Sequence, residues 1–316
     1  MTSPLISVII NNYNYGAYLA RAVQSALDQT DVRAEVIVVD DGSGDDSRAV
    51  IESFGDQIIA VFQSNAGQAA AINTGVRHSN GEILCFLDAD DWWSPNKLAA
   101  TAAAFGADPR VGLVYHRLQP INTDGSNAFA PIPRSLCQGD LAPLMVRSGG
   151  RWPFPMTSAV SVRRSLWNQI GDIPDSFRIS ADAWLVGIYP FFARVAAHPE
   201  PLGYYFIHAN NWYRAQDDAA MLQKRMAHWD ATVAATNQFL TERGQPHRLD
   251  LAEHFPYQTA RARLQGASPA ARLALLWDGL RDPGEPVLAR RIRDSMRAIR
   301  DVSGTGMDGA DPVGAP

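Results

Sequence analysis

The first hundred residues alternate between short apolar runs and segments with a helical period. Apolar runs at 5–10, 35–40, 58–63 and 82–88 predict strands, each bounded by polar or turn residues. Between them, apolar residues recur at helical spacing around 19–27, 50–54 and 69–76, and a further helix is expected from Ser94 and Pro95 onward. Near-continuous apolar strands that alternate with helices predict an α/β fold with a mostly parallel sheet and helices on both faces.

The pattern changes after about residue 110. Residues 111–162 contain prolines at 120, 131, 133, 143, 153 and 155, and they predict loops with short strands. Helices are predicted over 163–170 and 182–194, and a last strand over 202–208. From 216 the pattern is helical only, up to residue 301. Residues 302–316 are so rich in Gly, Pro and Asp that we expect a disordered tail.

Polar stretches follow three of the predicted strands. "NNYN" follows the first, "DDGS" the second and "DADD" the fourth. In open parallel sheets ligands bind at the carboxyl ends of the strands, so these stretches are expected to form one acidic pocket. Asp88 and Asp90 lie two apart and project to the same side. Two close carboxylates repel each other unless a cation joins them, which predicts a Mg²⁺ or Mn²⁺ site.

Composition narrows the class of protein. With 316 residues, 46% of them hydrophobic and 19% charged, the chain has the balance of a globular protein. The net charge of −5 gives no reason to expect a nucleic-acid partner. The two cysteines, Cys85 and Cys137, show no metal spacing, and Cys85 is expected to be a small buried residue. No signal-peptide pattern and no run of 18 apolar residues is visible, so we expect a cytoplasmic protein.

Several blocks of sequence together resemble family 2 glycosyltransferases, which have the GT-A fold. They are "SVIINNYNYGAYL", "VIVVDDGSGDDS", "NAGQAAAINTGVRHSNGEILCFLDADD", "TSAVSVRRSLWNQIGDIP", "SADAWL" and "YYFIHANN", and they cover roughly residues 5–213. The resemblance implies a nucleotide-sugar-binding half over 1–110 and an acceptor-binding half over 111–215, followed by a helical extension over 216–301. It also implies metal-assisted, inverting transfer from a nucleotide diphosphate sugar, with UDP favoured over GDP or dTDP, in polysaccharide, glycolipid or glycoconjugate synthesis.

The resemblance also implies roles for individual residues. Asp182 falls where the family places the general base, and Ala181 replaces an acid that often precedes it. His208 resembles a late histidine that can touch the metal beside Asp88 and Asp90. The nucleotide-binding candidates are Asn11, Asn12, Tyr13, Asp40, Asp41, Asn65, Gln68, Asp88, Ala89 and Asp90, of which Asn11 and Asn12 replace the usual Pro-Thr. The acceptor-side candidates are Asp91, Trp92, Trp93, Ser158 and Trp184.

Each of these roles has a structural alternative. Asp40 or Asp41 could cap the helix after the "DDGS" turn, Asn65 could cap the helix that follows it, and Asp182 could cap the helix over 182–194. A histidine in an aromatic strand, such as His208, is often a satisfied core residue. Large aromatic residues are mostly core residues too, so the three tryptophans could pack rather than stack on a sugar.

Two other functions remain open at this point. A sugar nucleotidyltransferase also combines a parallel sheet with metal-binding acids, but it would normally carry a Gly-rich, basic phosphate loop after the first strand, which "NNYNYGAYL" does not supply. A binding module could retain the nucleotide pocket and lack catalysis, an alternative that Ala181 keeps open.

The last predicted helix, "PVLARRIRDSMRAIR" over 286–300, is basic and amphipathic. Leu288, Ile292, Met296 and Ile299 are spaced as one helical face, and five arginines accompany the single Asp294. Such a helix can bind an anionic membrane surface, which would suit a lipid-linked sugar acceptor. Alternatively, the apolar face packs on the preceding helices and the arginines are solvated.

Overall fold

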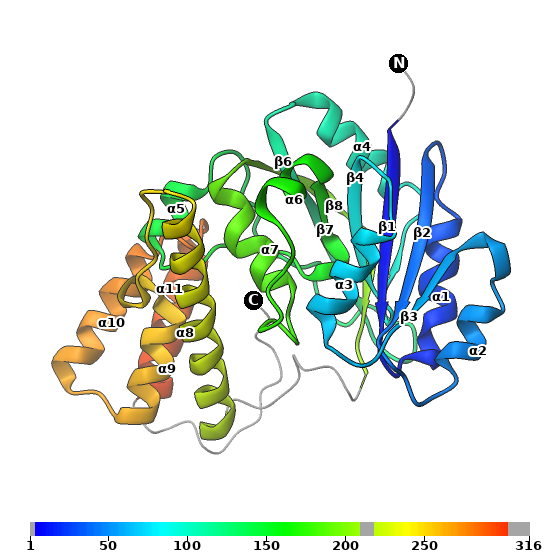
Figure 1. The fold of residues 1–316 in the computed structure, drawn as a ribbon. Helices are drawn as coiled ribbons and strands as arrows, with labels where there is room; N and C mark the ends of the chain where they lie inside the picture. Colours follow the sequence, from blue (N-terminus) through cyan, green and yellow to red (C-terminus); the bar gives the residue numbers. More distant parts are fainter. Residues whose placement is uncertain (1–3, 209–217, 303–316) are drawn as a thin grey trace. The chain divides into compact units, whose positions relative to one another are not determined.

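The computed structural model describes residues 4–208 and 218–302. It forms two compact units (Figure 1). The first contains the chain up to Asp140 and Pro155–His208, and the second contains Leu141–Phe154 and the described part of the chain after residue 208. Residues 141–154, which the sequence placed in the acceptor-binding half, therefore belong to the helical unit. The division of the first unit into two halves stays a prediction, and the tail over 303–316 lies outside the described residues.

The first unit is built around one mixed sheet with the strand order β3-β2-β1-β4-β7-β6-β8-β5. The strands are β1 (Leu5–Asn12), β2 (Arg33–Asp40), β3 (Ile59–Phe62), β4 (Ile83–Asp88), β5 (Trp92–Trp93), β6 (Val111–Ile121), β7 (Val160–Arg163) and β8 (Arg194–Phe206). Strands β3, β2, β1 and β4 are parallel. Strand β7 runs antiparallel to both β4 and β6. The four strands that the alternating pattern of the first hundred residues predicted therefore form the parallel part of the sheet.

Helices connect and cover these strands. They are α1 (Gly16–Leu27), α2 (Ser47–Glu52), α3 (Gln68–Arg77), α4 (Lys97–Ala107), α6 (Arg164–Ile170) and α7 (Asp182–Ile188). The first helix packs on β1 through Leu19, Val23 and Ala26, which are buried. Its apolar residues recur every three or four positions, so one face of the helix meets the sheet.

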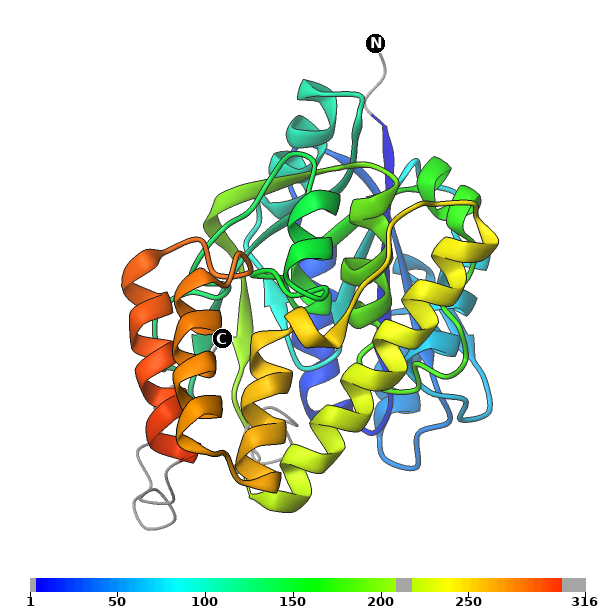
Figure 2. The ribbon, with the colours of Figure 1, turned by 90° about the vertical axis from the view of Figure 1, so that its left-hand side faces the viewer.

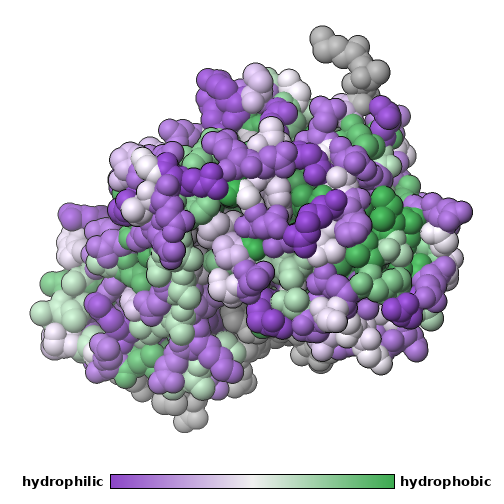
Figure 3. All heavy atoms as spheres, in the orientation of Figure 1, coloured by the Kyte–Doolittle hydropathy of each residue, from purple (hydrophilic) through white to green (hydrophobic). Residues whose placement is uncertain are grey.

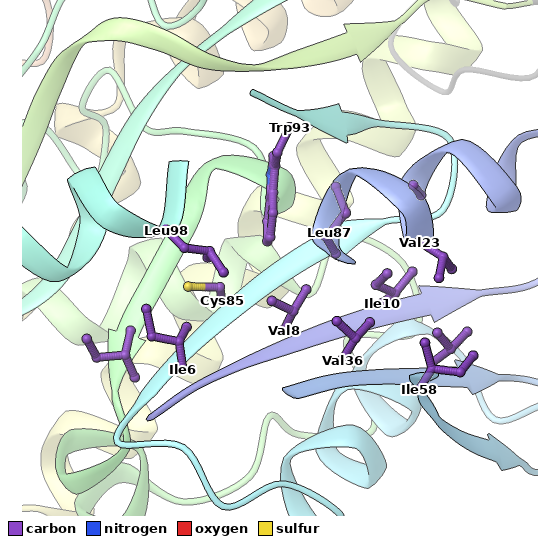
Figure 4. Packing of buried hydrophobic residues seen from close by; sticks show 14 of the residues in the cluster. Ile6, Val8, Ile10, Val23, Val36, Ile58, Cys85, Leu87, Trp93 and Leu98 are labelled. Atoms are coloured by element: carbon purple, nitrogen blue, oxygen red, sulfur yellow. The ribbon is translucent and has the colours of Figure 1, made fainter. Parts of the chain in front are cut away.

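The core of this unit lies between the sheet and its helices (Figure 4). Val8 and Ile10 of β1 lie on the same side as Cys85 and Leu87 of β4, because alternate residues of neighbouring parallel strands face one way. Val23 of α1 packs against them. Cys85 is fully buried, as expected for a small apolar residue. Burial of each large aliphatic side chain contributes about 1.5–3 kcal/mol.

Three elements differ from the sequence expectation. The expected short strands after residue 110 include the eleven-residue β6, and the last strand, β8, begins at Arg194 rather than at 202. The two are paired in parallel with register shifts around His116 and Arg117. These irregularities accommodate Pro199 and Pro201, which signal loops in a sequence. The helix expected over 182–194 ends at Ile188, and a 3₁₀ turn containing Pro190 follows.

The second unit is helical (Figure 2). Its helices are α5 (Ala142–Arg147), α8 (Ala219–Glu242), α9 (Phe255–Gln265), α10 (Pro269–Arg281) and α11 (Leu288–Val302). Phe255, Leu275, Ala298 and Val302 form its small core. Gly279 of α10 lies so close to Ser295 that a Cβ atom there would meet the Ser295 hydroxyl, so these small residues let α10 and α11 pack tightly. Among the described residues, no helix is both long and apolar enough to span a membrane.

Candidate active site

The carboxyl ends of β1, β2 and β4 bring the predicted polar stretches together. Asn11 is in register with Asp88, and Asn12 is in register with Asp40. The side-chain amide of Asn11 donates to Asp88 Oδ1 (3.0 Å), and that of Asn12 donates to Asp40 Oδ1 (2.8 Å). Each asparagine side chain is therefore oriented by a carboxylate. The buried Oδ1 atoms of Asn11 and Asn12 have no hydrogen-bond partner among the described residues.

Asp88, Asp90 and His208 form the centre of the site. His208 Nε2 lies 3.0 Å from Asp90 Oδ2, although the two residues are 118 positions apart. Asp88 Oδ1 accepts from Gln68 Nε2 (2.9 Å) as well as from Asn11. Burial raises the pKa of Asp88 to about 7, and the negative charge of Asp90 adds to this rise. His208 therefore lies beside Asp90, and Asp88 is within electrostatic range of Asp90, while the predicted role of the three residues as metal ligands stays a prediction.

Aromatic and basic side chains at the start of α1 adjoin these acids, and they were not among the residues predicted for the site. The ring of Tyr18 stacks on His208 (5.0 Å between centroids), and Tyr15 meets His208 edge-on (5.6 Å). Burial raises the pKa of Tyr15 to about 12, and Asp90 and Asp88 raise it further. Burial lowers the pKa of Arg21, and the nearby negative charges of Asp91 and Asp90 offset part of this effect. The available signal was the spacing of Tyr15, Tyr18 and Arg21 on one helical face.

Asp91 is held inside the protein. Only 2% of its surface is exposed, and it accepts hydrogen bonds from Ser158 Oγ (2.6 Å) and the backbone N–H of Phe206 (3.0 Å). Ser158 is fully buried and also accepts from the backbone N–H of Asp88 (3.1 Å). These two acceptor-side candidates therefore join the end of β4 to β8. Their direct contact with an acceptor stays a prediction.

Asp40 and Asp41 support the turn after β2. Asp40 accepts from the Ser43 hydroxyl (2.6 Å) and from Asn12. Asp41 accepts from Gln63 Nε2 and from the backbone N–H groups of residues 66 and 67, at 2.7–2.9 Å. Neither carboxylate caps α2, because the Ser47 N–H donates to Asp45 instead. Their predicted nucleoside contact remains a prediction.

We expect Asp41→Ala to lower the free energy of unfolding by about 1–3 kcal/mol, because it leaves the donors of the 63–67 loop without their acceptor. Chemical denaturation measures the change. Asp56→Ala, which removes an exposed acid from a 3₁₀ turn, is the control and should leave stability nearly unchanged. Equal stability of the two variants would show that Asp41 does not hold the loop.

Asn65 and Gln68 connect the start of α3 to the segment that precedes Asp182. Asn65 Oδ1 accepts from Arg178 Nη2 (3.0 Å), and Gln68 Oε1 accepts from the backbone N–H of Ala181 (2.9 Å). Asn65 does not serve as the N-cap of α3, which is Gly67. The predicted nucleotide contacts of Asn65 and Gln68 stay predictions.

Asp182 is the first residue of α7. Its Oδ1 accepts from the adjacent N–H of Ala183 (3.0 Å), while the N-cap position is Ala181, so Asp182 is not the N-cap residue. Burial raises the pKa of Asp182 to about 6. The charge of Asp182 also raises the pKa of Asp88, which places the two carboxyl groups within electrostatic range. A carboxyl group with this pKa is suited to accept a proton near neutral pH.

The three tryptophans occupy different environments. Trp93 is buried and donates from Nε1 to the Ser158 carbonyl (2.7 Å), and Trp184 is buried against Phe177. The half-buried Trp92 stacks on Tyr204 (5.0 Å between centroids), and the guanidinium carbon of Arg21 lies 3.5 Å from its ring centroid. All three rings thus have protein partners, and their stacking on an acceptor sugar stays a prediction.

The two remaining nucleotide candidates differ in exposure. Tyr13 lies just beyond β1 and is 47% exposed, so its ring is accessible. Ala89, between the two acids, is buried in the core that includes Leu87. Only Tyr13 of this pair presents a side chain to solvent.

The donor set fits a divalent cation that is shared with a ligand. Among the described residues, no three Asp, Glu, His or Cys side chains are arranged to hold a metal by themselves. Mg²⁺ and Mn²⁺ are typically bound by one or two carboxylates together with substrate phosphates. Asp88 and Asp90 match that requirement, since a nucleotide diphosphate would supply the other oxygen ligands.

Residues 7–164 match the family described as glycosyl transferase family 2. An uncharacterized glycosyltransferase of Nostoc sp. is 38% identical over 265 residues, which cover 80% of this chain and 81% of that protein. The chain belongs to glycosyltransferase family 2. It is also 30% identical to the glycosyltransferase GlyG of Streptococcus pneumoniae over 182 residues, which cover 53% of this chain and 60% of GlyG. As the resemblance of its sequence blocks predicted, the protein is therefore an enzyme that transfers a glycosyl group.

Solved structures confirm the expected GT-A fold. TarS of S. aureus in complex with UDP-GlcNAc superposes with a TM-score of 0.55 at 18% identity, over 96% of this chain and 90% of that one. The mannosyltransferase PcManGT from Pyrobaculum calidifontis, in complex with GDP-Man and Mn²⁺, gives a TM-score of 0.54 at 20% identity, over 95% and 86% of the two chains. At these identities the likeness establishes the fold.

Proposed function

We propose that this glycosyltransferase moves a sugar from a nucleotide diphosphate sugar to an acceptor hydroxyl with inversion. The observation that carries the proposal is the arrangement of Asp88 and the residues before Asp182 around one side chain. Gln68 donates to Asp88 and accepts from Ala181, the residue before Asp182. Asp88, proposed to bind the diphosphate through the metal, and Asp182, proposed as the base, therefore come from distant parts of the sequence but lie near the same side chain.

Asp88 and Asp90 would hold the divalent metal, Mn²⁺ or Mg²⁺. When bound, the ion neutralises negative charge on the diphosphate leaving group. Similar folds in complex with GDP-Man and Mn²⁺, and with UDP and Mg²⁺, support this assignment.

The first strand offers a contact for the base. Asn12 is buried and both of its N–H groups are engaged, by Asp40 (2.8 Å) and by the Ser43 hydroxyl (3.2 Å). Its unpartnered Oδ1 can accept a hydrogen bond, which suits the ring N–H of a uracil, a thymine or a guanine. We favour UDP as the nucleotide, and the complex of TarS with UDP-GlcNAc supports that choice.

Asp182 takes the acceptor proton in this mechanism. The acceptor oxygen forms a bond to the anomeric carbon while the bond from that carbon to the diphosphate oxygen breaks, and the proton passes to the Asp182 carboxylate. A single displacement from the opposite face inverts the anomeric centre. Positioned general-base catalysis is typically worth about 10²–10⁴-fold.

A donor screen tests the proposal. Thermal shift with UDP-, GDP- and dTDP-sugars is measured with and without Mn²⁺, and hits are then assayed for release of the nucleotide diphosphate. Metal-dependent stabilisation and slow donor hydrolysis are expected. Binding without hydrolysis or transfer would favour the non-catalytic binding module. Release of pyrophosphate from a nucleoside triphosphate and a sugar phosphate would favour the nucleotidyltransferase.

The last helix supports a second, separate proposal, that this enzyme binds anionic membranes. Helix α11 packs through Ser295, Ala298 and Val302, and this leaves Leu288, Ile292 and Met296 exposed at 62%, 47% and 60%. The fourth residue of the predicted apolar face, Ile299, is half-buried, so the alternative that this face is covered by the preceding helices does not hold for the other three. Five arginines against two aspartates along the helix supply a positive surface next to them. Exposed apolar residues beside cationic ones are typical of interfacial helices.

We expect Ile292→Glu with Met296→Glu to lower binding to vesicles of mixed neutral and anionic lipid by about tenfold or more, since both apolar insertion and charge attraction weaken. Co-sedimentation measures the bound fraction. Ile59→Glu, at an exposed apolar position on β3, is the matched control and should bind like the unchanged protein. Negligible binding of the unchanged protein would contradict the proposal.

Figure 3 shows that the face it displays is mostly hydrophilic, with hydrophobic areas of limited extent.

A further inference from the structure

Hydrogen bonds at both ends and in the middle of α3 join this helix to the segment 172–181 that leads into Asp182. At the end of the helix Arg77 pairs with Asp172 (2.7 Å). In the middle, the buried side chain of Asn73 donates to the carbonyl of Ile173 (2.8 Å) and accepts from the N–H of the same residue (2.9 Å). We call this row of contacts the α3 seam. It runs along a helix whose first residue, Gln68, contacts Asp88.

The start of α3 completes the seam with backbone contacts. The N–H of Gln68 donates to the carbonyl of Arg178 (2.8 Å). Gly67 has a φ of +96°, and a Cβ atom there would lie 2.8 Å from Arg178 Cα. The segment therefore approaches α3 as closely as a glycine permits. Further along, Ser180 also has a positive φ, of +61°. For a residue other than glycine this backbone conformation persists only where surrounding contacts hold it.

Gln68 is the point where the seam reaches the acids. Its Nε2 donates to Asp88 Oδ1 (2.9 Å) and lies 3.4 Å from Thr157 Oγ1, while its Oε1 accepts from the N–H of Ala181 (2.9 Å). One rigid amide therefore spans from the carboxylate at the end of β4 to the residue before Asp182. The separation of Gln68 from Ala181 is 113 positions, so this contact depends on the tertiary fold.

We propose that Gln68 is a positioning residue, which fixes the Asp182 segment relative to Asp88 by its own two amide contacts at the Asp88 end of the α3 seam. The role rests on the proposed function, since it assigns Asp182 as the base. In this role Gln68 acts through its neighbours and does not itself contact the reacting atoms. A misplacement of a reacting group by about 1 Å can lower the rate by about 10²-fold. A fixed distance between Asp88 and Asp182 would therefore keep the rate of transfer high.

The structural part of the proposal is tested by hydrogen exchange on the full chain. Gln68→Leu removes both amide contacts, and we expect the backbone amides of 178–184 to exchange about tenfold or more faster. Arg77→Met, which breaks the exposed ion pair at the other end of the seam, is the matched control and should leave exchange at 178–184 unchanged. If Gln68→Leu lowers the yield of folded protein, Gln68→Ser serves instead. Unchanged exchange in the Gln68 variant would overturn the proposal, whatever reaction the enzyme catalyses.

The catalytic part is tested by separating turnover from binding. With a donor identified by the screen, we expect Gln68→Leu to lower kcat for donor hydrolysis by about tenfold or more while the Kd for UDP with Mn²⁺ changes less than about threefold. Equal losses in kcat and in UDP affinity would instead show a direct nucleotide contact and overturn the positioning role. Because the exchange experiment needs no donor, failure of the screen and failure of the seam are distinguishable.

Discussion

Replacement of Asp182 by Asn is expected to lower the turnover of this glycosyltransferase by about 10²-fold or more, while nucleotide binding stays nearly unchanged. The amide has the shape of the carboxyl group but cannot accept the acceptor proton. The side chain lies at the start of α7 and its described hydrogen bonds are to the backbone N–H groups of Ala183 and of Asp182 itself, so the substitution leaves most of the surrounding structure intact.

Donor hydrolysis and calorimetry with UDP and Mn²⁺ measure the two quantities separately. Asp175→Asn is the matched control, because Asp175 is an exposed acid on the same segment. Turnover of Asp182→Asn close to that of the control would assign the base to another residue.

The pH dependence of turnover should report the same carboxyl group. A general base acts in its deprotonated form, and burial raises the pKa of Asp182 to about 6. The rate should therefore rise with pH through about 6 and fall below it. The residual rate of Asp182→Asn should lack this limb of the profile.

Replacement of Asp90 by Ala is expected to abolish the part of UDP binding that depends on Mn²⁺. It removes one of the two carboxylates at the centre of the site and also the 3.0 Å contact with His208. With Asp90 removed, the cation would lose one of the two carboxylates assigned to it, and the diphosphate would lose the charge that the cation supplies.

Calorimetry with UDP in the presence and absence of Mn²⁺ measures this effect. Asp46→Ala is the control, because Asp46 is an exposed acid at the start of α2 that makes no side-chain cap hydrogen bond. We expect the control to retain the gain in affinity on addition of Mn²⁺. If Asp90→Ala retains the same gain, the metal is bound elsewhere.

The amino-acid sequence by itself determined the class of fold and the family. Apolar runs such as 35–40 identify strands because a parallel sheet is buried on both faces, and the polar residues that follow them lie at one edge of that sheet. Their position after a strand made Asp88 and Asp90 candidates for a site at this edge, and the order of several sequence blocks indicated the family. Local order is enough to predict the strands and these candidates, since each depends on residues within one element and its flanking turn.

Only the tertiary structure decided which side chains meet. Asp91 belongs to the same acidic stretch as Asp90 but bonds internally to Ser158, 67 positions away. Gln68, predicted as a nucleotide contact, also makes hydrogen bonds to both Asp88 and Ala181. Such pairings between distant segments leave no periodicity in the sequence, because they are fixed by how the loops and helices pack.

Helix α11 illustrates the same limit. Its pattern showed an apolar face through Leu288, Ile292 and Met296, but it could not show whether another helix covers that face. The structure packs α11 through Ser295 and its small neighbours, because close approach to Gly279 requires small side chains. Hydrophobic spacing predicts that a helix is amphipathic, and the packing partners decide which of its residues remain exposed.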